Sequence, residues 1–307
     1  MEHSFIMLIK YKLILFLLIL LIFSSCSKDK TAKVNSSSEK EFTEEKKSSS
    51  DKISNSELSK YDISSNDPRI IELSKELKEI SGLTMTPDGR MFAQQDEDGI
   101  VYQLNTETGE VIKRFYLGEP PLRKDFEDIA FANNKFYMLH SNGDIYEFSE
   151  GVDGEAVNYK LYKTDLSKEN DVEGMCFDPK TNTLLLITKG KSGTNNRDDK
   201  AVYSFSLSDM KFNPEPRFVL KRSEIKDYFN PSGIEYNHLT GTFFVIAANG
   251  NEIVEVSNEG IVMGNEKLPG KIHAQPEGIT FLQDGTMYIS NEGKKDRANL
   301  VVYPLVK

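Results

Sequence analysis

The chain has few of the residues that bind soft metals or cross-link small secreted folds. Its 307 residues include two cysteines, four histidines and no tryptophan. Two cysteines allow at most one disulfide, so a disulfide-stapled scaffold is excluded. No Cys-x-x-Cys pair and no His-Glu-x-x-His sequence occurs, which argues against a zinc site. Cys176 lies in the apolar stretch Met175–Phe177 and is predicted to be a buried, unreactive side chain.

Sequence motifs that indicate one particular chemistry are also missing. The chain has no Gly-x-Ser-x-Gly elbow and no phosphate-binding Walker loop. Acidic residues outnumber basic ones, 48 to 38, and the net charge is −10. Residues 1–67 carry no net charge, so the whole excess falls on residues 68–307. This acidity argues against nucleic acid and favours cations, cationic ligands or a protein as partners.

No apolar run near the N-terminus reaches the about 20 residues of a membrane-spanning helix. The run Leu13–Phe23 has eleven residues, the length of a signal-peptide core. Two lysines precede it, and two serines and Cys26 follow. This order resembles a bacterial lipoprotein signal, which implies that residues 1–25 are removed and that lipid on Cys26 anchors the protein to a membrane. The protein is then extracytoplasmic, in the cell envelope. The alternatives are a plain signal peptide with an incidental cysteine, or an uncleaved anchor.

Residues 26–67 are predicted to be the lipidated cysteine and a disordered tether. Serine supplies 12 of residues 27–67, and eight lysines nearly balance nine acidic residues. A segment of this composition has too little apolar surface to offset its ordering entropy. It is expected to hold the folded domain, residues 68–307, away from the membrane.

An internal repeat is the most informative feature of residues 68–307. A two-residue motif, Ser or Glu followed by Gly or Asp, precedes an apolar strand. It occurs five times, beginning at Ser81, Glu127, Glu173, Ser232 and Glu277. The spacings of 46, 46, 59 and 45 residues fit the about 40 to 50 residues of a four-stranded propeller blade. The sequence therefore predicts an all-β propeller.

The last repeat is one strand short, because the chain ends just after its third strand. The β-prone stretch Arg69–Leu73 precedes the first repeat and is expected to complete the last blade and close the ring. Five blades account for every predicted strand. Six blades are the alternative, because the polar stretch Gly190–Lys200 lengthens one repeat. A closed propeller has no edge that demands pairing, which favours a monomer.

The repeats resemble the SdiA-regulated family of β-propellers, which is related to esterase-like and phytase-like propellers. The resemblance covers residues 68–307 and is carried by five short motifs: Ile80-Ser81-Gly82-Leu83, Phe126-Glu127-Asp128-Ile129-Ala130, Val172-Glu173-Gly174-Met175, Pro231-Ser232-Gly233-Ile234 and Gln275-Pro276-Glu277-Gly278-Ile279. It implies a propeller that can bind calcium and implies no particular reaction.

Five equivalent positions are expected to meet at the mouth of the central channel, since each stands just before an innermost strand. Three of them carry carboxylates, Glu127, Glu173 and Glu277, and two are Ser81 and Ser232. Three neighbouring carboxylates raise one another's pKa unless a counter-charge is present. Calcium binds six to eight oxygens and supplies that charge. The three glutamates are therefore predicted to bind Ca²⁺, although solvated glutamates beside structural glycines explain the pattern equally well.

A second set of polar residues is expected near these five, mostly at the ends of the second strands. It comprises Asp96, Asp98, Asp128, His140, Lys189, Asn249, Asn291 and Glu292. Lys189 follows an apolar strand and is expected to pair with one of the rim glutamates, which could replace the metal as counter-charge.

Three functions are compatible with this arrangement. The first is a membrane-anchored binding module that holds a calcium-like cation and presents its face to a small ligand or a protein. The second is a metal-dependent phosphatase or esterase of the phytase type, in which the ion activates water. The third is a metal-free scaffold for protein partners. The absence of catalytic motifs leaves enzyme status open.

Overall fold

The computed structural model describes residues 56–65, 67–196, 198–225 and 228–306. The chain divides into two units, residues 1–48 and 49–307, and all described residues belong to the second. The predicted signal peptide, Cys26 and most of the tether lie outside the described residues, so the lipid anchor stays a prediction. None of the helices within the described ranges is long and apolar enough to cross a membrane.

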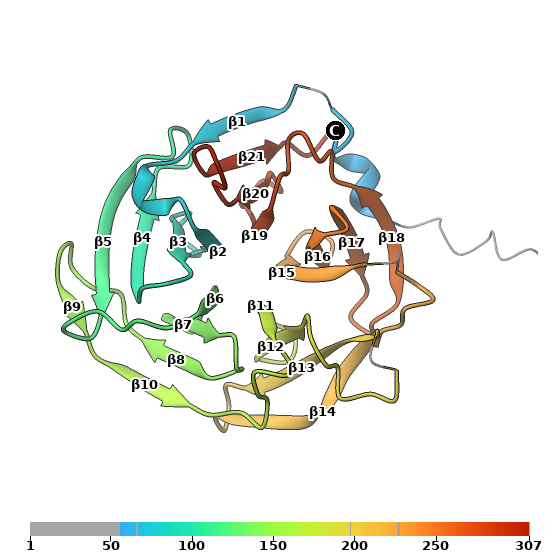
Figure 1. Ribbon diagram of the computed structural model, residues 1–307, viewed down its shortest axis with the longest axis horizontal. Helices are drawn as coiled ribbons and strands as arrows, with labels where there is room; N and C mark the ends of the chain where they lie inside the picture. Colours follow the sequence, from blue (N-terminus) through green and yellow to red (C-terminus); the bar gives the residue numbers. More distant parts are fainter. Residues whose placement is uncertain (1–55, 66, 197, 226–227, 307) are drawn as a thin grey trace, which may run out of the picture. The chain divides into compact units, whose positions relative to one another are not determined.

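Five sheets are arranged around a central axis, with one strand of each nearest the centre (Figure 1). Blade 1 consists of β2 (Ile80–Met85), β3 (Met91–Gln95), β4 (Ile100–Leu104), β5 (Val111–Leu117) and the parallel addition β9 (Ala156–Val157). Blade 2 consists of β6 (Phe126–Ala132), β7 (Lys135–His140), β8 (Ile145–Phe148) and β10 (Tyr159–Tyr162). Blade 3 consists of β11 (Val172–Asp178), β12 (Thr183–Thr188), β13 (Lys200–Ser206) and β14 (Lys211–Leu220). Blade 4 consists of β15 (Asn230–Asn237), β16 (Thr242–Asn249), β17 (Glu252–Val256) and β18 (Val262–Lys267).

Blade 5 is built from both ends of the domain. Its strands are β19 (Pro276–Phe281), β20 (Met287–Asn291), β21 (Asn299–Tyr303) and β1 (Arg69–Glu72). The antiparallel register of β1 and β21 aligns Arg69 with Val302 and Glu72 with Asn299. The predicted closure by the N-terminal strand is therefore confirmed. Five blades are confirmed over six, since the described residues between β12 and β13 form no strand.

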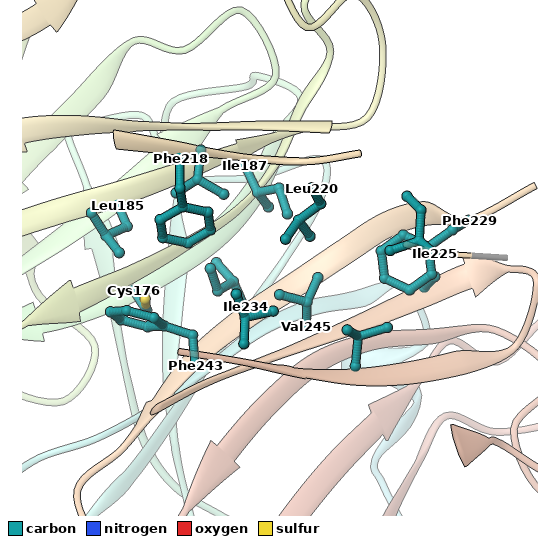
Figure 2. Close-up of a cluster of buried hydrophobic side chains, with 14 residues drawn as sticks. Cys176, Leu185, Ile187, Phe218, Leu220, Ile225, Phe229, Ile234, Phe243 and Val245 are labelled. Carbon is teal, nitrogen blue, oxygen red and sulfur yellow. The ribbon is translucent and has the colours of Figure 1, made fainter. Parts of the chain in front are cut away.

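The hydrophobic core is divided among the five contacts between neighbouring blades. Each of five clusters of buried side chains takes most of its members from two adjacent blades. Figure 2 shows the cluster between blades 3 and 4, where Cys176 packs near Phe243. Cys176 is 1% exposed, which confirms its prediction as a buried apolar side chain.

The glycine of the repeated motif allows the innermost strands to approach one another closely. A Cβ atom on Gly233 would lie 2.5 Å from the carbonyl oxygen of Glu277 in the next blade. A Cβ on Gly278 would lie 2.8 Å from the carbonyl oxygen of Ser81, and one on Gly174 would lie 3.0 Å from the amide nitrogen of Ile234. These glycines are thus required for contact between blades.

Part of the predicted tether is folded. The 3₁₀ helix η2 (Glu57–Lys60) begins after Ser56, whose hydroxyl donates to the buried Glu255 carboxylate (2.9 Å). Leu58, Tyr61 and Ile63 are at most 2% exposed and pack between blades 4 and 5. We call residues 56–63 the clasp. A second 3₁₀ helix, η3 (Lys75–Leu77), connects β1 to blade 1.

Candidate functional site

A cavity of about 180 Å³ lies where the innermost strands begin. It brings together seven carboxylates and one lysine. The carboxylates belong to Glu79, Asp96, Asp125, Glu127, Glu173, Glu277 and Glu292, and the lysine is Lys189. We call this cavity the acidic mouth. The three predicted rim glutamates line it together, as the repeat register predicts.

Lys189 supplies the counter-charge for one of the three rim glutamates. Its Nζ atom donates to Glu173 Oε1 (2.7 Å) and lies 4.0 Å from Asp171 Oδ2. The predicted pairing of Lys189 with a rim glutamate is therefore confirmed. The Glu127 carboxylate forms no hydrogen bond or ion pair with any described residue. One lysine thus balances a small part of the negative charge in the acidic mouth.

Four carboxylates of the acidic mouth, those of Asp96, Glu127, Glu173 and Glu277, have raised pKa values. Burial, together with the nearby Glu173 and Asp125 carboxylates, raises the pKa of Glu127. Burial also raises the pKa of Glu277 to about 8, although a hydrogen bond from Gln275 opposes the change. Asp96 reaches a pKa of about 6 through burial and the nearby Glu79 carboxylate. Burial would lower the pKa of Lys189, but the Glu173 carboxylate raises it overall.

These shifts predict that the metal-free protein loses stability as the pH rises from about 5 to 8. Between its ordinary pKa of 4.5 and its folded-state pKa of about 8, Glu277 keeps its proton in the folded state and loses it in the unfolded state. The folded state then binds more protons, so each pH unit in this window lowers the free energy of unfolding by up to about 1.4 kcal/mol. Urea denaturation in chelator at pH 5.5 and 8 measures the change.

Glu277→Gln should reduce this pH dependence, because the amide does not titrate. Glu215→Gln is the matched control, since Glu215 is exposed on β14. A free energy of unfolding that stays constant or rises between pH 5.5 and 8 in the wild-type protein would contradict the prediction.

Three residues of the acidic mouth were not predicted from the sequence. Each stands two positions before the first residue of the repeated motif. Glu79 precedes Ser81 by two, Asp125 precedes Glu127 and Gln275 precedes Glu277. Side chains two apart along an extended chain point the same way. This alternation is the sequence signal that could have predicted them.

Four of the predicted residues have partners that turn them away from the acidic mouth. The Asp128 carboxylate is 3% exposed and accepts the backbone N–H of Met175 in blade 3 (2.7 Å), so it links two blades. His140 is 8% exposed, and its Nδ1 accepts the backbone N–H of Asn142 (3.1 Å). Asn291 Oδ1 lies 3.1 Å from His273 Nδ1. Asp98 Oδ1 lies 3.2 Å from Arg123 Nε.

The two serines of the motif also connect blades. Ser81 Oγ donates to the carbonyl oxygen of Glu127 and Ser232 Oγ donates to that of Pro276, each at 2.6 Å. Ser81 still lines the acidic mouth. Ser232 and Asn249 line a smaller cavity of about 120 Å³ that shares Lys189 and Glu277 with the acidic mouth. Predicted residues from every blade therefore lie at this end of the propeller.

The donor set fits a hard cation, because carboxylate oxygens dominate and no cysteine or histidine lines the acidic mouth. Among the described residues, however, no group of three or more acidic, histidine or cysteine side chains is already arranged around a metal position. The side chains of Glu127, Glu173 and Glu277 would have to move together to bind one ion, and Glu173 would have to leave Lys189.

Comparisons with known proteins support the propeller fold. The glutaminyl cyclase of Myxococcus xanthus is similar in structure, with a TM-score of 0.55, 13% identity and coverage of 78% of this chain and 94% of that one. The PQQ-bound aldose sugar dehydrogenase of Streptomyces coelicolor gives a TM-score of 0.48 at 10% identity, covering 78% and 99% of the two chains. At 13% identity the likeness to the cyclase concerns the fold alone. No curated protein matches the sequence.

The family comparison agrees with the resemblance carried by the repeated motifs. The matched residues, 208–304, include blade 4, which contributes Ser232, and the strands of blade 5 that contribute Glu277. The family model that matches the chain over these residues is that of the SdiA-regulated proteins.

Proposed function

We propose that this protein is a binding propeller whose acidic mouth holds a calcium-like divalent cation and presents that face to a small ligand or a protein. The observation that carries the proposal is the charge imbalance: seven carboxylates share one cavity with a single lysine. A divalent cation would neutralise the mutual repulsion of these carboxylates and offset the cost of burying them. Glu127, Glu173 and Glu277 are the residues that would hold it.

The bound cation would order the mouth and leave its outward side open to a second ligand. Because Lys189 already pairs with Glu173 (2.7 Å), lysine and metal compete for the same carboxylate. The same scarcity of positive charge disfavours a phosphate ester as substrate, since a site that binds phosphate needs several cations. Binding therefore ranks above hydrolysis. The lipid anchor at Cys26 remains a prediction from the sequence.

Calorimetric titration with CaCl₂ tests the proposal on a chain that begins at residue 56. The wild-type protein is expected to bind about one ion, and the triple variant Glu127→Gln, Glu173→Gln and Glu277→Gln is expected to bind none. Lys189→Met removes the competing cation and should tighten calcium binding about tenfold, or about 1.4 kcal/mol. Glu215→Gln is the control for a lost charge outside the mouth.

If the triple variant binds calcium as well as the wild-type protein does, the ion lies elsewhere and the proposal is overturned. Weaker binding to Lys189→Met than to the wild-type protein would contradict the competition between lysine and metal.

A further inference from the structure

A second, larger cavity lies at the opposite ends of the innermost strands. Its volume is about 550 Å³, within the range of small-molecule sites. Each blade contributes one large apolar side chain at the same register, three residues after the second position of the repeated motif. These side chains are Met85, Phe131, Phe177, Tyr236 and Phe281. We call this space the aromatic cavity.

Among the described residues that line the aromatic cavity, Glu235 is the one carboxylate, His238 is the one basic side chain, and none is a lysine or arginine. The equivalent positions in the other four blades carry uncharged side chains: Thr84, Ala130, Cys176 and Thr280. The fold therefore does not require an acid at this register. A carboxylate in this position is costly, because its surroundings are largely apolar.

The Glu235 carboxylate lacks a cationic partner within the described ranges. One oxygen, Oε1, accepts the backbone N–H of the adjacent Tyr236 (2.8 Å), and Glu235 forms no ion pair with a described residue. Two basic side chains of blade 3 are engaged elsewhere, since Lys180 donates to the Gly241 carbonyl oxygen (3.2 Å) and Arg217 on β14 lies 3.8 Å from Asp178. Burial raises the pKa of Glu235 to about 8.

We infer that the aromatic cavity binds a small organic cation, an amine with a hydrophobic body. The ammonium group would pair with Glu235, and the hydrophobic body would pack against the rings of Phe131, Phe177 and Tyr236. Aromatic faces near the carboxylate add cation–π attraction to that pairing. An anion would meet the carboxylate with no lysine or arginine in the described lining to offset it. A neutral apolar molecule would bury the carboxylate without a partner, and a metal ion would find only one carboxylate.

The probe is 2-phenylethylamine, compared with 2-phenylethanol, which has a similar shape and no charge. Calorimetry at pH 8.5 on the chain beginning at residue 56 is expected to detect the amine at millimolar concentration or below. Binding of the alcohol should be at least tenfold weaker. Glu235→Gln should weaken binding of the amine at least tenfold, whereas the exposed Glu215→Gln should not change it.

A separate NMR measurement shows where the amine binds. In protein labelled with ¹³C on the methionine methyl groups, the amine should shift the resonance of Met85, which lines the cavity, and leave that of Met263 on the outermost strand β18 in place. The acidic mouth is excluded if the double variant Glu127→Gln and Glu277→Gln binds the amine with unchanged affinity.

The inference is overturned by any of three results: no binding of the amine at 10 mM, equal binding of the alcohol, or an affinity that survives Glu235→Gln but is lost in the double variant at the acidic mouth. If Glu235→Gln fails to fold, the affinity of Phe177→Leu for the amine and the shift of the Met85 methyl resonance still test the inference. Unchanged affinity in Phe177→Leu together with an unshifted Met85 methyl also overturns it.

Discussion

Replacing Gly233 with alanine is expected to lower the free energy of unfolding by about 3 kcal/mol, although the change adds only one methyl group. The new Cβ atom would lie 2.5 Å from the carbonyl oxygen of Glu277 in the neighbouring blade. That oxygen belongs to the backbone of an innermost strand, so it can move only if the two blades separate. Urea denaturation measures the loss.

Gly270→Ala is the matched control. A Cβ atom at Gly270 meets no atom closer than 4.0 Å, and neither glycine has a positive φ angle, so the two substitutions differ in space and not in backbone strain. The control is expected to change the free energy of unfolding by less than about 0.5 kcal/mol. Equal stability of Gly233→Ala and Gly270→Ala would contradict the role of the glycine in contact between blades.

Removal of the clasp is the other change with a large expected effect. A chain beginning at residue 68 keeps β1 and all five blades but exposes the apolar surface that Leu58, Tyr61 and Ile63 cover between blades 4 and 5. Truncation of a single buried leucine or isoleucine costs about 2–5 kcal/mol. After allowance for the entropy of the ordered segment, we expect a net loss of about 3 kcal/mol relative to a chain beginning at residue 56.

For a domain of this size such a loss lowers the melting temperature by about 6–12 °C. Differential scanning calorimetry of the two chains measures it. Within the longer chain, Leu58→Ala should account for much of the effect and the exposed Ser59→Ala for none. Equal melting temperatures of the two chains would mean that the clasp contributes no stability.

The blades could be predicted from the sequence because each strand has a local pattern that repeats. Apolar and polar residues alternate along the third strands, turn residues separate the strands, and the repeated two-residue motif occurs in every blade. Ring closure followed from counting, since the last repeat lacked one strand and Arg69–Leu73 was available.

The clasp could not be predicted in this way. Its three buried residues, Leu58, Tyr61 and Ile63, stand among serines, lysines and acids, and they follow neither a helical nor a strand period for long enough to be recognised. They are ordered by the surface that blades 4 and 5 offer and by the buried Glu255, which accepts from Ser56 and from the backbone N–H of Glu57 (2.6 Å). Contacts between residues about 200 positions apart leave no local signal.

Residues of the acidic mouth that share one position of the repeat could be predicted from the sequence. Residues whose location depends on the direction of the side chain could not. Glu127, Glu173 and Glu277 share one position of the repeat, so they meet at the acidic mouth. Asp128 is the exception among the second positions, which are otherwise glycine. Its carboxylate occupies the gap between blades 2 and 3 and accepts the Met175 N–H (2.7 Å). His140 and Asn291 end their strands with the side chain buried, which a strand assignment cannot reveal.

Thermal melting in calcium and in chelator tests whether the acidic mouth binds a divalent cation. A ligand at 100 times its dissociation constant adds about 2.7 kcal/mol of stability, which corresponds to about 5–11 °C for a domain of this size. We expect that rise for the wild-type chain beginning at residue 56, and no rise when Glu127, Glu173 and Glu277 are all replaced by glutamine. Identical melting curves of the wild-type chain in calcium and in chelator would contradict it.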